Sequence, residues 1–340
     1  MKEKLIDEIN NLFVPTMALQ SITDDIQYIR RVSSISHYEK EPICLLVTGE
    51  TGTGKSEFIK QYSERYPKIE EAERTKIPVL VSLIPKAKHP KPVVSQLLRD
   101  IGDPLEGTGG DSTMLTDRFI TLLKGAGVEL IILDEFQHLI ETKSNQVVYD
   151  IADFIKTLIS KSKIPVVLFG LPWSSHILAV NSQLSRRFAM RQELLNYTIY
   201  TYQDFQKFVE KIQQKLENLS IKFEVDLWRH EMSFRLFAGC DGNISNLMNN
   251  IIRPAAISVV DNNEMLIKPS HFSQAFKRFG QVRDEINPFI LDIRKIEAHV
   301  QKSSSYWNPN VPKGSSRVID MTHTIVRFSD ITLKDVFSKK

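Results

Sequence analysis

Cysteine is scarce in this sequence, since Cys44 and Cys240 are the only two among 340 residues. Two cysteines cannot build the disulfide framework of a small secreted domain, and they fit a reducing compartment. No apolar run reaches the ~18 residues that a membrane-spanning helix requires. The opening residues, MKEKLIDEINNLF, place acids among their apolar positions and therefore lack the apolar core of a signal peptide. These absences predict a cytoplasmic protein without a membrane partner.

A large excess of one charge is also missing, because the formal net charge is only +3. This value does not by itself indicate a nucleic-acid partner. The charges are unevenly placed, however, since the stretch from Arg74 to Arg99 contains basic residues and no acid. Such a stretch is typical of a phosphate-contacting face, and it equally fits a solvated surface. Its basic residues are Arg74, Lys76, Lys86, Lys88, Lys91 and Arg99.

A chain of 340 residues has room for two domains of roughly 100–200 residues each. Four short apolar runs, at residues 43–49, 78–85, 128–135 and 164–170, have the composition of buried strands. Stretches with the apolar spacing of helices separate these runs. The alternation predicts an α/β fold, in which a parallel sheet is flanked by helices on both faces.

The rest of the sequence favours helices. Residues before 41 have helical spacing with a break at Pro15, and helical spacing dominates after residue 201. From Ser303 the composition is polar and rich in breakers, which is typical of a linker, and the more apolar HTIVRFSDITLKDVF is a candidate docking element. We therefore expect an N-terminal helical segment (1–40), an α/β domain (41–200), a small all-helical lid (201–285) and a C-terminal segment for partner docking (286–340).

The segment GETGTGKS matches the phosphate-binding pattern G-x-x-x-x-G-K-[ST] in full. It follows the first expected strand and precedes a helix, as that pattern requires. Its glycines let the backbone approach phosphates, and its N–H groups can form an anion-binding nest at the start of the helix. Lys55 is expected to reach the outer phosphates of ATP, and Ser56 to ligate Mg²⁺. The predicted nucleotide-binding residues are Gly49, Glu50, Thr51, Gly52, Thr53, Gly54, Lys55 and Ser56.

Two acids, Asp134 and Glu135, end the third expected strand. In an open parallel sheet, ligands bind at the carboxyl ends of the strands, where Gly49 is also expected. Asp134 is therefore a candidate Mg²⁺ ligand, and Glu135 a candidate base that orients and deprotonates the attacking water. Both acids would also suit the first turn of the following helix, but the phosphate loop favours the metal-and-water site. A water-activating Glu135 predicts an ATPase rather than a nucleotide kinase.

Arg186 and Arg187 follow the fourth expected strand. In a monomer they would be surface charges. In a ring of subunits, one of them can reach the γ-phosphate bound by a neighbour and stabilise the charge of the transition state. We favour Arg186 as this arginine finger with Arg187 beside it, although the sequence does not order the two.

Four segments resemble the AAA+ transposition regulators called TnsC and TniB. They are GETGTGKS, LIILDEFQHL, FGLPWSSHILAVNSQLSRRF and GCDGNISNLMNNIIRPAAISVV, and they have the order and spacing of that family over about residues 42–260. The first two are shared with all AAA+ proteins, and the third is more specific. The resemblance implies an AAA+ domain with a helical lid that hydrolyses ATP.

The resemblance also implies partners. Proteins of this kind assemble as homo-oligomeric rings or filaments on double-stranded DNA, receive a signal from a target-selecting protein or guide-RNA complex, and recruit transposase subunits. Contacts to DNA backbone phosphates would be independent of base sequence and sensitive to salt. On charge alone, Lys86, Lys88 and Lys91 are the candidate DNA-binding residues.

Two features depart from the family pattern. The polar residue that often ends the fourth strand is not evident, and Ser174 is the nearest candidate. The lid helix from Asn243 carries Ser245 and Asn246 where an arginine often points at the phosphates, and Arg253 comes too late. These departures predict slow hydrolysis, which suits a switch. Another AAA+ loader, of the replication-initiator or helicase-loader type, remains an alternative, whereas Glu135 and the lid disfavour a monomeric P-loop kinase.

Overall fold

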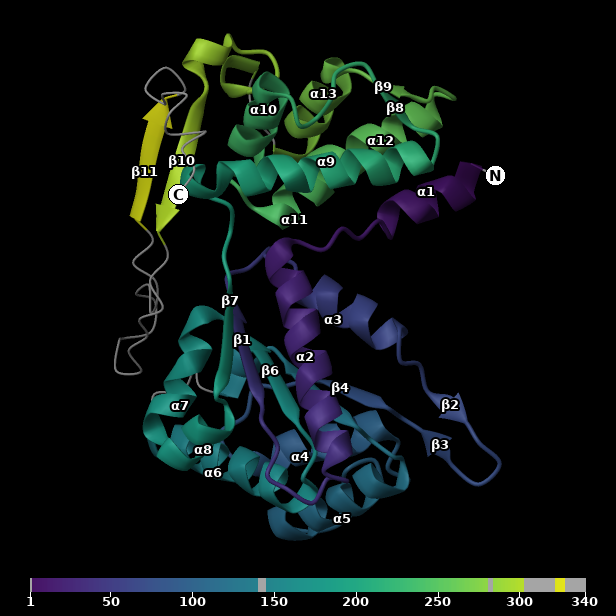
Figure 1. The fold of residues 1–340 in the computed structure, drawn as a ribbon, viewed down its shortest axis with the longest axis vertical. Helices are drawn as coiled ribbons and strands as arrows, with labels where there is room; N and C mark the ends of the chain where they lie inside the picture. Colours follow the sequence, from purple (N-terminus) through teal and green to yellow (C-terminus); the bar gives the residue numbers. More distant parts are fainter. Residues whose placement is uncertain (1, 140–144, 281–283, 303–321, 328–340) are drawn as a thin grey trace.

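The computed structural model describes residues 2–139, 145–280, 284–302 and 322–327. Its centre is a five-stranded parallel sheet with the strand order β4–β5–β6–β1–β7 (Figure 1). The strands are β1 (Leu45–Gly49), β4 (Val79–Leu83), β5 (Leu130–Asp134), β6 (Val166–Gly170) and β7 (Met190–Leu194). The first four confirm the strands expected from the sequence. The fifth, β7, is an edge strand that the sequence analysis did not anticipate.

Helices cover both faces of this sheet, so the α/β fold is confirmed (Figure 1). One face carries α2 (Met17–Ile35) and α3 (Lys55–Glu64). The other face carries α4 (Pro90–Ile101), α5 (Ser112–Gly125), α6 (Asn145–Ser162), α7 (His176–Val180) and α8 (Ser182–Arg187). A small antiparallel pair, β2 (Ile69–Glu70) with β3 (Thr75–Lys76), lies between α3 and β4 in the chain.

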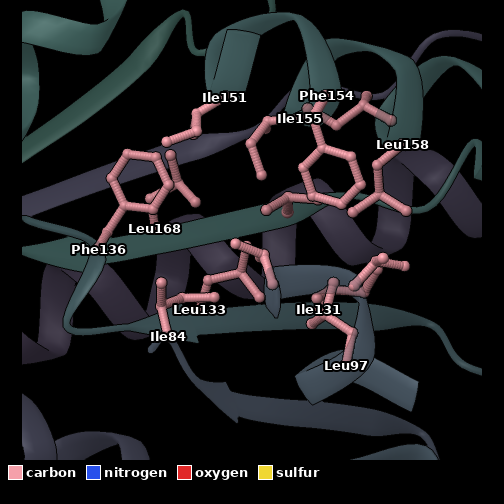
Figure 2. Packing of buried hydrophobic residues seen from close by; sticks show 14 of the residues in the cluster. Ile84, Leu97, Ile131, Leu133, Phe136, Ile151, Phe154, Ile155, Leu158 and Leu168 are labelled. Atoms are coloured by element: carbon pink, nitrogen blue, oxygen red, sulfur yellow. The ribbon is translucent and has the colours of Figure 1, made fainter. Parts of the chain in front are cut away.

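Alternate residues of each strand enter different cores, as strand geometry requires. In β5, Ile131 and Leu133 join the core under α4 to α8, whereas Leu130 and Ile132 join the core under α2 and α3. Figure 2 shows the first of these cores, in which side chains of α6 such as Ile155 cover the sheet. Burial on both faces explains why these strands read as continuous apolar runs. Parallel pairing then brings their carboxyl ends to one edge of the sheet.

A second body follows β7 and is mainly helical. It contains α9 (Tyr202–Asn218), α10 (His230–Cys240), α11 (Ile244–Asn246), a π-helix (Leu247–Ile252), α12 (Arg253–Asp261) and α13 (Pro269–Gly280). Its core is rich in aromatic side chains, and Tyr202 and Phe237 meet edge to face at 5.7 Å between ring centroids. The lid is not wholly helical as expected, because β8 (Lys222–Phe223) and β9 (Leu266–Ile267) form a short parallel pair.

The N-terminal segment is divided between the two bodies. Helix α1 (Lys2–Asn10) lies on the lid, where Ile9 and Leu12 are part of the lid core (Figure 1). Helix α2 lies on the sheet, where Ile22 and Ile26 are part of the core. Residues 11–16 join the two helices. The segment 1–40 is therefore not a structural unit of its own.

The C-terminal segment also begins later than expected. Ile296 and Ala298 are buried in the lid core, and Arg235 of α10 donates to the carbonyl oxygen of Leu291 at 2.8 Å. The lid therefore extends past the expected boundary at residue 286. Strand β10 (Glu297–Lys302) pairs antiparallel with β11 (Thr322–Arg327), which contains the start of the candidate docking element. The expected linker, SSSYWNPNVPKGSS (303–316), and the end of that element lie outside the described residues.

The basic segment that carries Lys86, Lys88 and Lys91 is partly helical. Helix α4 begins at Pro90, because proline is well suited to the first position of a helix, so Lys91 lies in the first helical turn. No helix among the described residues is both long and apolar enough to cross a membrane.

Candidate nucleotide-binding site

The phosphate loop connects the end of β1 to the start of α3. Gly52 and Gly54 have φ angles of 84° and 92°, a region that side chains other than glycine disfavour. The hydroxyl of Thr53 donates to the carbonyl oxygen of Glu50 at 2.8 Å and closes the turn. The loop thus presents backbone N–H groups at the N-terminus of a ten-residue helix, an arrangement that binds anions.

Lys55 begins this helix and is only 8% exposed. Its Nζ donates to the carbonyl oxygens of Gly49 and of Glu50, the latter at 2.7 Å. Burial lowers the pKa of Lys55 to about 8, and the carboxylates of Asp134 and Glu135 partly offset this effect. The ammonium group therefore lacks full solvation, and anionic oxygen atoms placed beside it would stabilise its charge.

Asp134 ends β5 at the same edge of the sheet. Its Oδ2 accepts a hydrogen bond from the hydroxyl of Ser56 at 3.4 Å, and its Oδ1 accepts from the N–H of Glu135 at 2.8 Å. Burial raises the pKa of Asp134, as expected for a carboxylate that is 7% exposed. A hydroxyl and a carboxylate in contact are a donor set that fits Mg²⁺. Among the described residues no group of three His, Cys, Asp or Glu could hold a metal alone, so phosphate and water would complete the ligands.

The carboxylate of Glu135 is held by two side chains that follow it in the 3₁₀ turn of residues 136–139. Gln137 donates to it from Nε2, and His138 Nε2 lies 3.7 Å from its Oε2. Gln137 also accepts from the N–H of Leu171 at 3.2 Å, beyond the end of β6. Glu135 has a φ of 56°, an uncommon conformation for this residue type that turns the chain sharply after the strand. The only sequence signal of Gln137 and His138 is their polarity next to an acidic strand end, which does not predict this role.

A cleft of about 240 Å³ lies between the phosphate loop, the acidic pair and the lid. It is lined by Thr51, Gly52, Gly54, Lys55, Ser56, Glu57, Glu135, Gln137, Leu171 and Ser245. The structure therefore brings the loop and Glu135 together around one opening, with Asp134 bonded to Ser56 beneath it. This opening is large enough for a chain of phosphate groups, and its walls carry the N–H groups, ammonium and carboxylates described above.

A second cavity of about 110 Å³ shares Gly54, Glu57 and Ser245 with this cleft. Its other walls are mostly apolar and come from three parts of the chain: the segment 12–19, α9, and residues 244–253 from α11 to the start of α12. Among them are Leu12, Val14, Leu19, Phe208, Ile244 and Met248. An apolar cavity beside a phosphate cleft suits a flat aromatic group such as a nucleotide base. No local sequence pattern predicts this cavity, because its walls are far apart in the chain.

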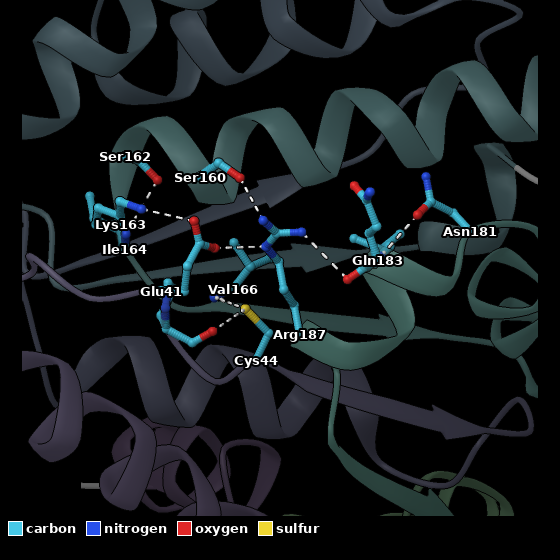
Figure 3. Close-up of polar contacts among 12 residues, drawn as sticks. Glu41, Cys44, Ser160, Ser162, Lys163, Ile164, Val166, Asn181, Gln183 and Arg187 are labelled. Atoms are coloured by element: carbon cyan, nitrogen blue, oxygen red, sulfur yellow. Dashed lines mark hydrogen bonds and ion pairs between the residues drawn. The ribbon is translucent and has the colours of Figure 1, made fainter.

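The two candidate finger arginines have different surroundings, and those of Arg187 are drawn in Figure 3. Arg187 binds Glu41 with 2.8 Å between Nε and Oε2, and donates from Nη2 to Ser160 Oγ at 2.7 Å. Arg186 is exposed, and among the described residues its side chain forms no hydrogen bond or ion pair.

The position of these arginines relative to the sheet is also informative. The carbonyl oxygen of Arg187 accepts from the N–H of Cys44, just before β1, whereas the phosphate loop follows the other end of β1. The five residues of β1 separate the two places by about 16 Å at ~3.3 Å per residue. Arg186 and Arg187 therefore do not line the cleft of their own subunit.

Lys86, Lys88 and Lys91 all have exposed side chains. They follow β4, and the buried Ala87 and Val93 anchor the segment that carries them to the core. The carbonyl oxygen of Ile84, two residues before Lys86, contacts His138 Nδ1 at 3.0 Å. The basic segment is thus joined to the turn that holds Glu135, and it does not line the cleft.

Of the residues considered where the family pattern is missing, Ser245 lines the cleft, whereas Ser174 and Arg253 do not. Ser174 is fully buried against Gly170, and its hydroxyl has no partner among the described residues. Arg253 donates from Nη2 to the carbonyl oxygen of Leu12 at 3.0 Å and lines the second cavity. Gln137, rather than Ser174, is the polar side chain between the carboxyl ends of β5 and β6.

A family model described as bacterial TniB protein matches residues 6–195, which is more than half of the chain. Among solved structures, the Aeropyrum pernix ORC2 protein in ADPNP–ADP complexes has a TM-score of 0.58 at 15% identity, covering 86% of this chain and 75% of that one. Cdc6p from Pyrobaculum aerophilum has a TM-score of 0.50 at 12% identity, covering 76% and 68%. No curated protein matches the chain. At these identities the structural likeness shows the fold, which is that of AAA+ proteins.

Proposed function

Because the chain belongs to the TniB family, we propose that it is an ATP-dependent regulator of DNA transposition. The observation that carries this proposal is the cleft, in which a complete phosphate loop faces Glu135 under a helical lid. Nucleotide binding in the cleft would control whether the protein assembles on duplex DNA.

We assign ATP to the cleft and the cavity beside it. The N–H groups of residues 50–56 and the ammonium of Lys55 would bind the phosphates, and the apolar cavity would hold the base. The similar ORC2 structures were solved as ADPNP–ADP complexes and in an ADP form, which supports a nucleotide here. Mg²⁺ held by Ser56 and Asp134 would neutralise charge on the phosphate oxygens.

In the proposed hydrolysis, Glu135 accepts a proton from the water that attacks the γ-phosphate. Its carboxylate lines the cleft and is held in place by Gln137 and His138, so it can orient a water molecule without moving far. Lys55 stabilises the charge that develops on the transferred phosphoryl group. No arginine is among the residues that line this cleft, so a third source of positive charge must come from elsewhere.

We propose that Arg186 of a neighbouring subunit supplies this charge. It is exposed and has no partner among the described residues, whereas Arg187 is bound by Glu41 and Ser160. Both lie at the opposite end of β1 from the phosphate loop, so they can serve only another copy of the chain. Hydrolysis would then require a homo-oligomer, which agrees with a ring or filament.

Duplex DNA is the proposed template for that assembly, and Lys86, Lys88 and Lys91 are the proposed contacts. Their exposed ammonium groups on an anchored segment suit backbone phosphates, which carry no base identity. A target-selecting protein or guide-RNA complex and the transposase subunits are the further partners that the family implies.

Another AAA+ loader would have the same cleft, since the fold is shared with ORC2 and Cdc6p. The match over residues 6–195 favours the transposition regulator. The testing experiment is negative-stain imaging of the chain with duplex DNA and a non-hydrolysable ATP analogue. We expect rings or filaments threaded by DNA, which are absent without nucleotide and absent for Lys55→Ala. Dispersed monomers of the unmodified chain in every condition would contradict the proposal.

A further inference from the structure

A continuous series of hydrogen bonds between three polar side chains connects the phosphate loop to the lid. Asn196 donates from Nδ2 to Glu50 Oε2 at 2.9 Å, and Asn243 donates from Nδ2 to Asn196 Oδ1 at 3.2 Å. Glu50 belongs to the phosphate loop, Asn196 to the connection from β7 to the lid, and Asn243 to the start of α11. The three residues are far apart in the sequence and meet only in the folded chain.

Two of the three side chains in this hydrogen-bonded series are buried, so their hydrogen bonds matter for stability. Glu50 and Asn196 are only 6% and 9% exposed. A carboxylate removed from water must be compensated by donors, since an uncompensated one strongly destabilises the conformation that buries it. Glu50 does not line the phosphate cleft, and its carboxylate is directed to the lid connection.

The lid also holds the backbone of the loop directly. Asn243 Nδ2 donates to the carbonyl oxygen of Thr51, and the N–H of Ser245 donates to the carbonyl oxygen of Gly52, both at 3.0 Å. A methyl group on Gly52 would lie 2.5 Å from Asn243, so the contact has no free space. The C=O and N–H of one planar peptide unit point in opposite directions. Fixing two carbonyls on the lid therefore fixes the N–H groups of Gly52 and Thr53 on the other side.

From these contacts we propose that Asn196 and Asn243 are positioning residues for the phosphate loop, which they hold in its anion-binding shape and couple to the lid. The inference rests on the proposed function, because its ligand is the phosphate chain of ATP. The coupling takes the place of an arginine reaching from the lid to the phosphates, which is not among the residues that line the cleft. Phosphates that rearrange the loop carbonyls would change the same bonds that fix the lid.

The test is a donor–acceptor exchange. Asn196→Asp replaces the donor to Glu50 with a second carboxylate, and we expect nucleotide affinity to fall about tenfold, since a bond to a charged group is removed. Glu50→Gln alone measures the effect of removing the charge of Glu50 on nucleotide affinity, because its amide oxygen can still accept from Asn196. In the double variant Glu50→Gln, Asn196→Asp, the new amide donates to the new carboxylate, and we expect affinity within about threefold of the unmodified chain.

A second pair of variants tests the lid side. Asn243→Asp keeps the oxygen that caps α11 by accepting from the N–H of Asn246, but it removes the donor to Thr51. Asn246→Asp is the matched control, because Asn246 is exposed on the same helix and does not touch the loop. We expect hydrogen exchange at residues 244–252 to slow on nucleotide binding in the unmodified chain and in Asn246→Asp, but not in Asn243→Asp.

The readouts are the affinity for a fluorescent ATP analogue, lid hydrogen exchange, and thermal unfolding as a check that each variant folds. If the unmodified chain binds no nucleotide, the proposed function fails first. Suppose instead that the unmodified chain binds nucleotide, and that Asn196→Asp and Asn243→Asp show the same affinity and the same change in lid hydrogen exchange. The coupling is then refuted, whereas the proposed ATP site is not. A folded double variant that binds nucleotide as weakly as Asn196→Asp would also refute the proposed role of the bond between residues 50 and 196.

Discussion

Arg187 forms an ion pair with Glu41, with 2.8 Å between Arg187 Nε and Glu41 Oε2, although 146 residues separate them in the chain. Lys163 binds the other oxygen of the same carboxylate at 2.8 Å. Hydrogen bonding to Arg187 lowers the pKa of Glu41, so this carboxylate stays charged down to low pH. Arg187 is thus occupied within its own subunit, which leaves Arg186 as the arginine that can serve a neighbour.

We expect Arg186→Ala to lower the ATPase rate by about 10³-fold or more, the range of an arginine finger, without lowering the melting temperature. Arg187→Ala should lower the melting temperature, because it removes a bond to Ser160 and a half-buried ion pair. Mixing Arg186→Ala with Glu135→Gln subunits should restore part of the rate, since the second variant still binds ATP and supplies the arginine that the first lacks. An Arg186→Ala chain with the unmodified rate would remove the finger from this position.

Nucleotide affinity should depend on pH through Lys55. Burial lowers its pKa to about 8 in the free protein, and bound phosphates would raise it again, so binding takes up a proton above that pH. We expect affinity to be highest below pH 8 and to fall by up to about tenfold per unit as pH rises above it. Calorimetry in buffers of different ionisation enthalpy measures the proton uptake directly. Affinity that stays constant between pH 7 and 9.5 would contradict this pKa.

The variant Glu135→Gln should bind ATP but hydrolyse it at least about 10²-fold more slowly, because a general base contributes ~10²–10⁴-fold. The donor set of Ser56 and Asp134 is unchanged, so the nucleotide should remain bound and assemblies on DNA should persist. Single-turnover hydrolysis and the lifetime of assemblies by imaging measure the two effects. Hydrolysis at the unmodified rate would assign the base elsewhere.

Charge reversal of Lys86, Lys88 and Lys91 to Glu should weaken binding to duplex DNA and flatten its salt dependence. Removing one lysine–phosphate interaction should reduce the slope of log affinity against log salt by roughly 0.9. The side chains are exposed, so nucleotide binding and stability should be retained. Reversal of Lys4, Lys207 and Lys222, which lie on the lid helices α1 and α9 and strand β8, provides a control of equal charge. Equal DNA binding by the two variants would exclude the basic segment from the interface.

The sequence predicted those parts of the fold that local patterns encode. The buried strands β1, β4, β5 and β6 are apolar runs, and the phosphate loop is a complete motif, so each could be identified without tertiary information. The edge strand β7 pairs only with β1, and its polar, half-exposed sequence MRQEL does not form an apolar run. It was therefore missed.

Contacts between distant residues could not be predicted. Nothing in the local pattern around Ile296 or Ala298 indicates that they complete the lid core. The same holds for the bonds of Glu50 to Asn196 and of Arg187 to Glu41, each of which joins residues 146 positions apart. The assignments of the acidic pair, the arginines and the basic segment remain predictions, which the experiments above test.

The division of the N-terminal segment has a mechanical consequence. Within the described residues, the chain crosses between the sheet domain and the lid twice, at residues 11–16 and again between β7 and α9. A body attached at one point can turn about three axes, whereas a body attached at two points turns only about the line that joins them. The lid would then rotate about the axis through the two connections, and the angle of this rotation would set how far the cleft is open. A distance measured across the cleft would report the angle of that rotation.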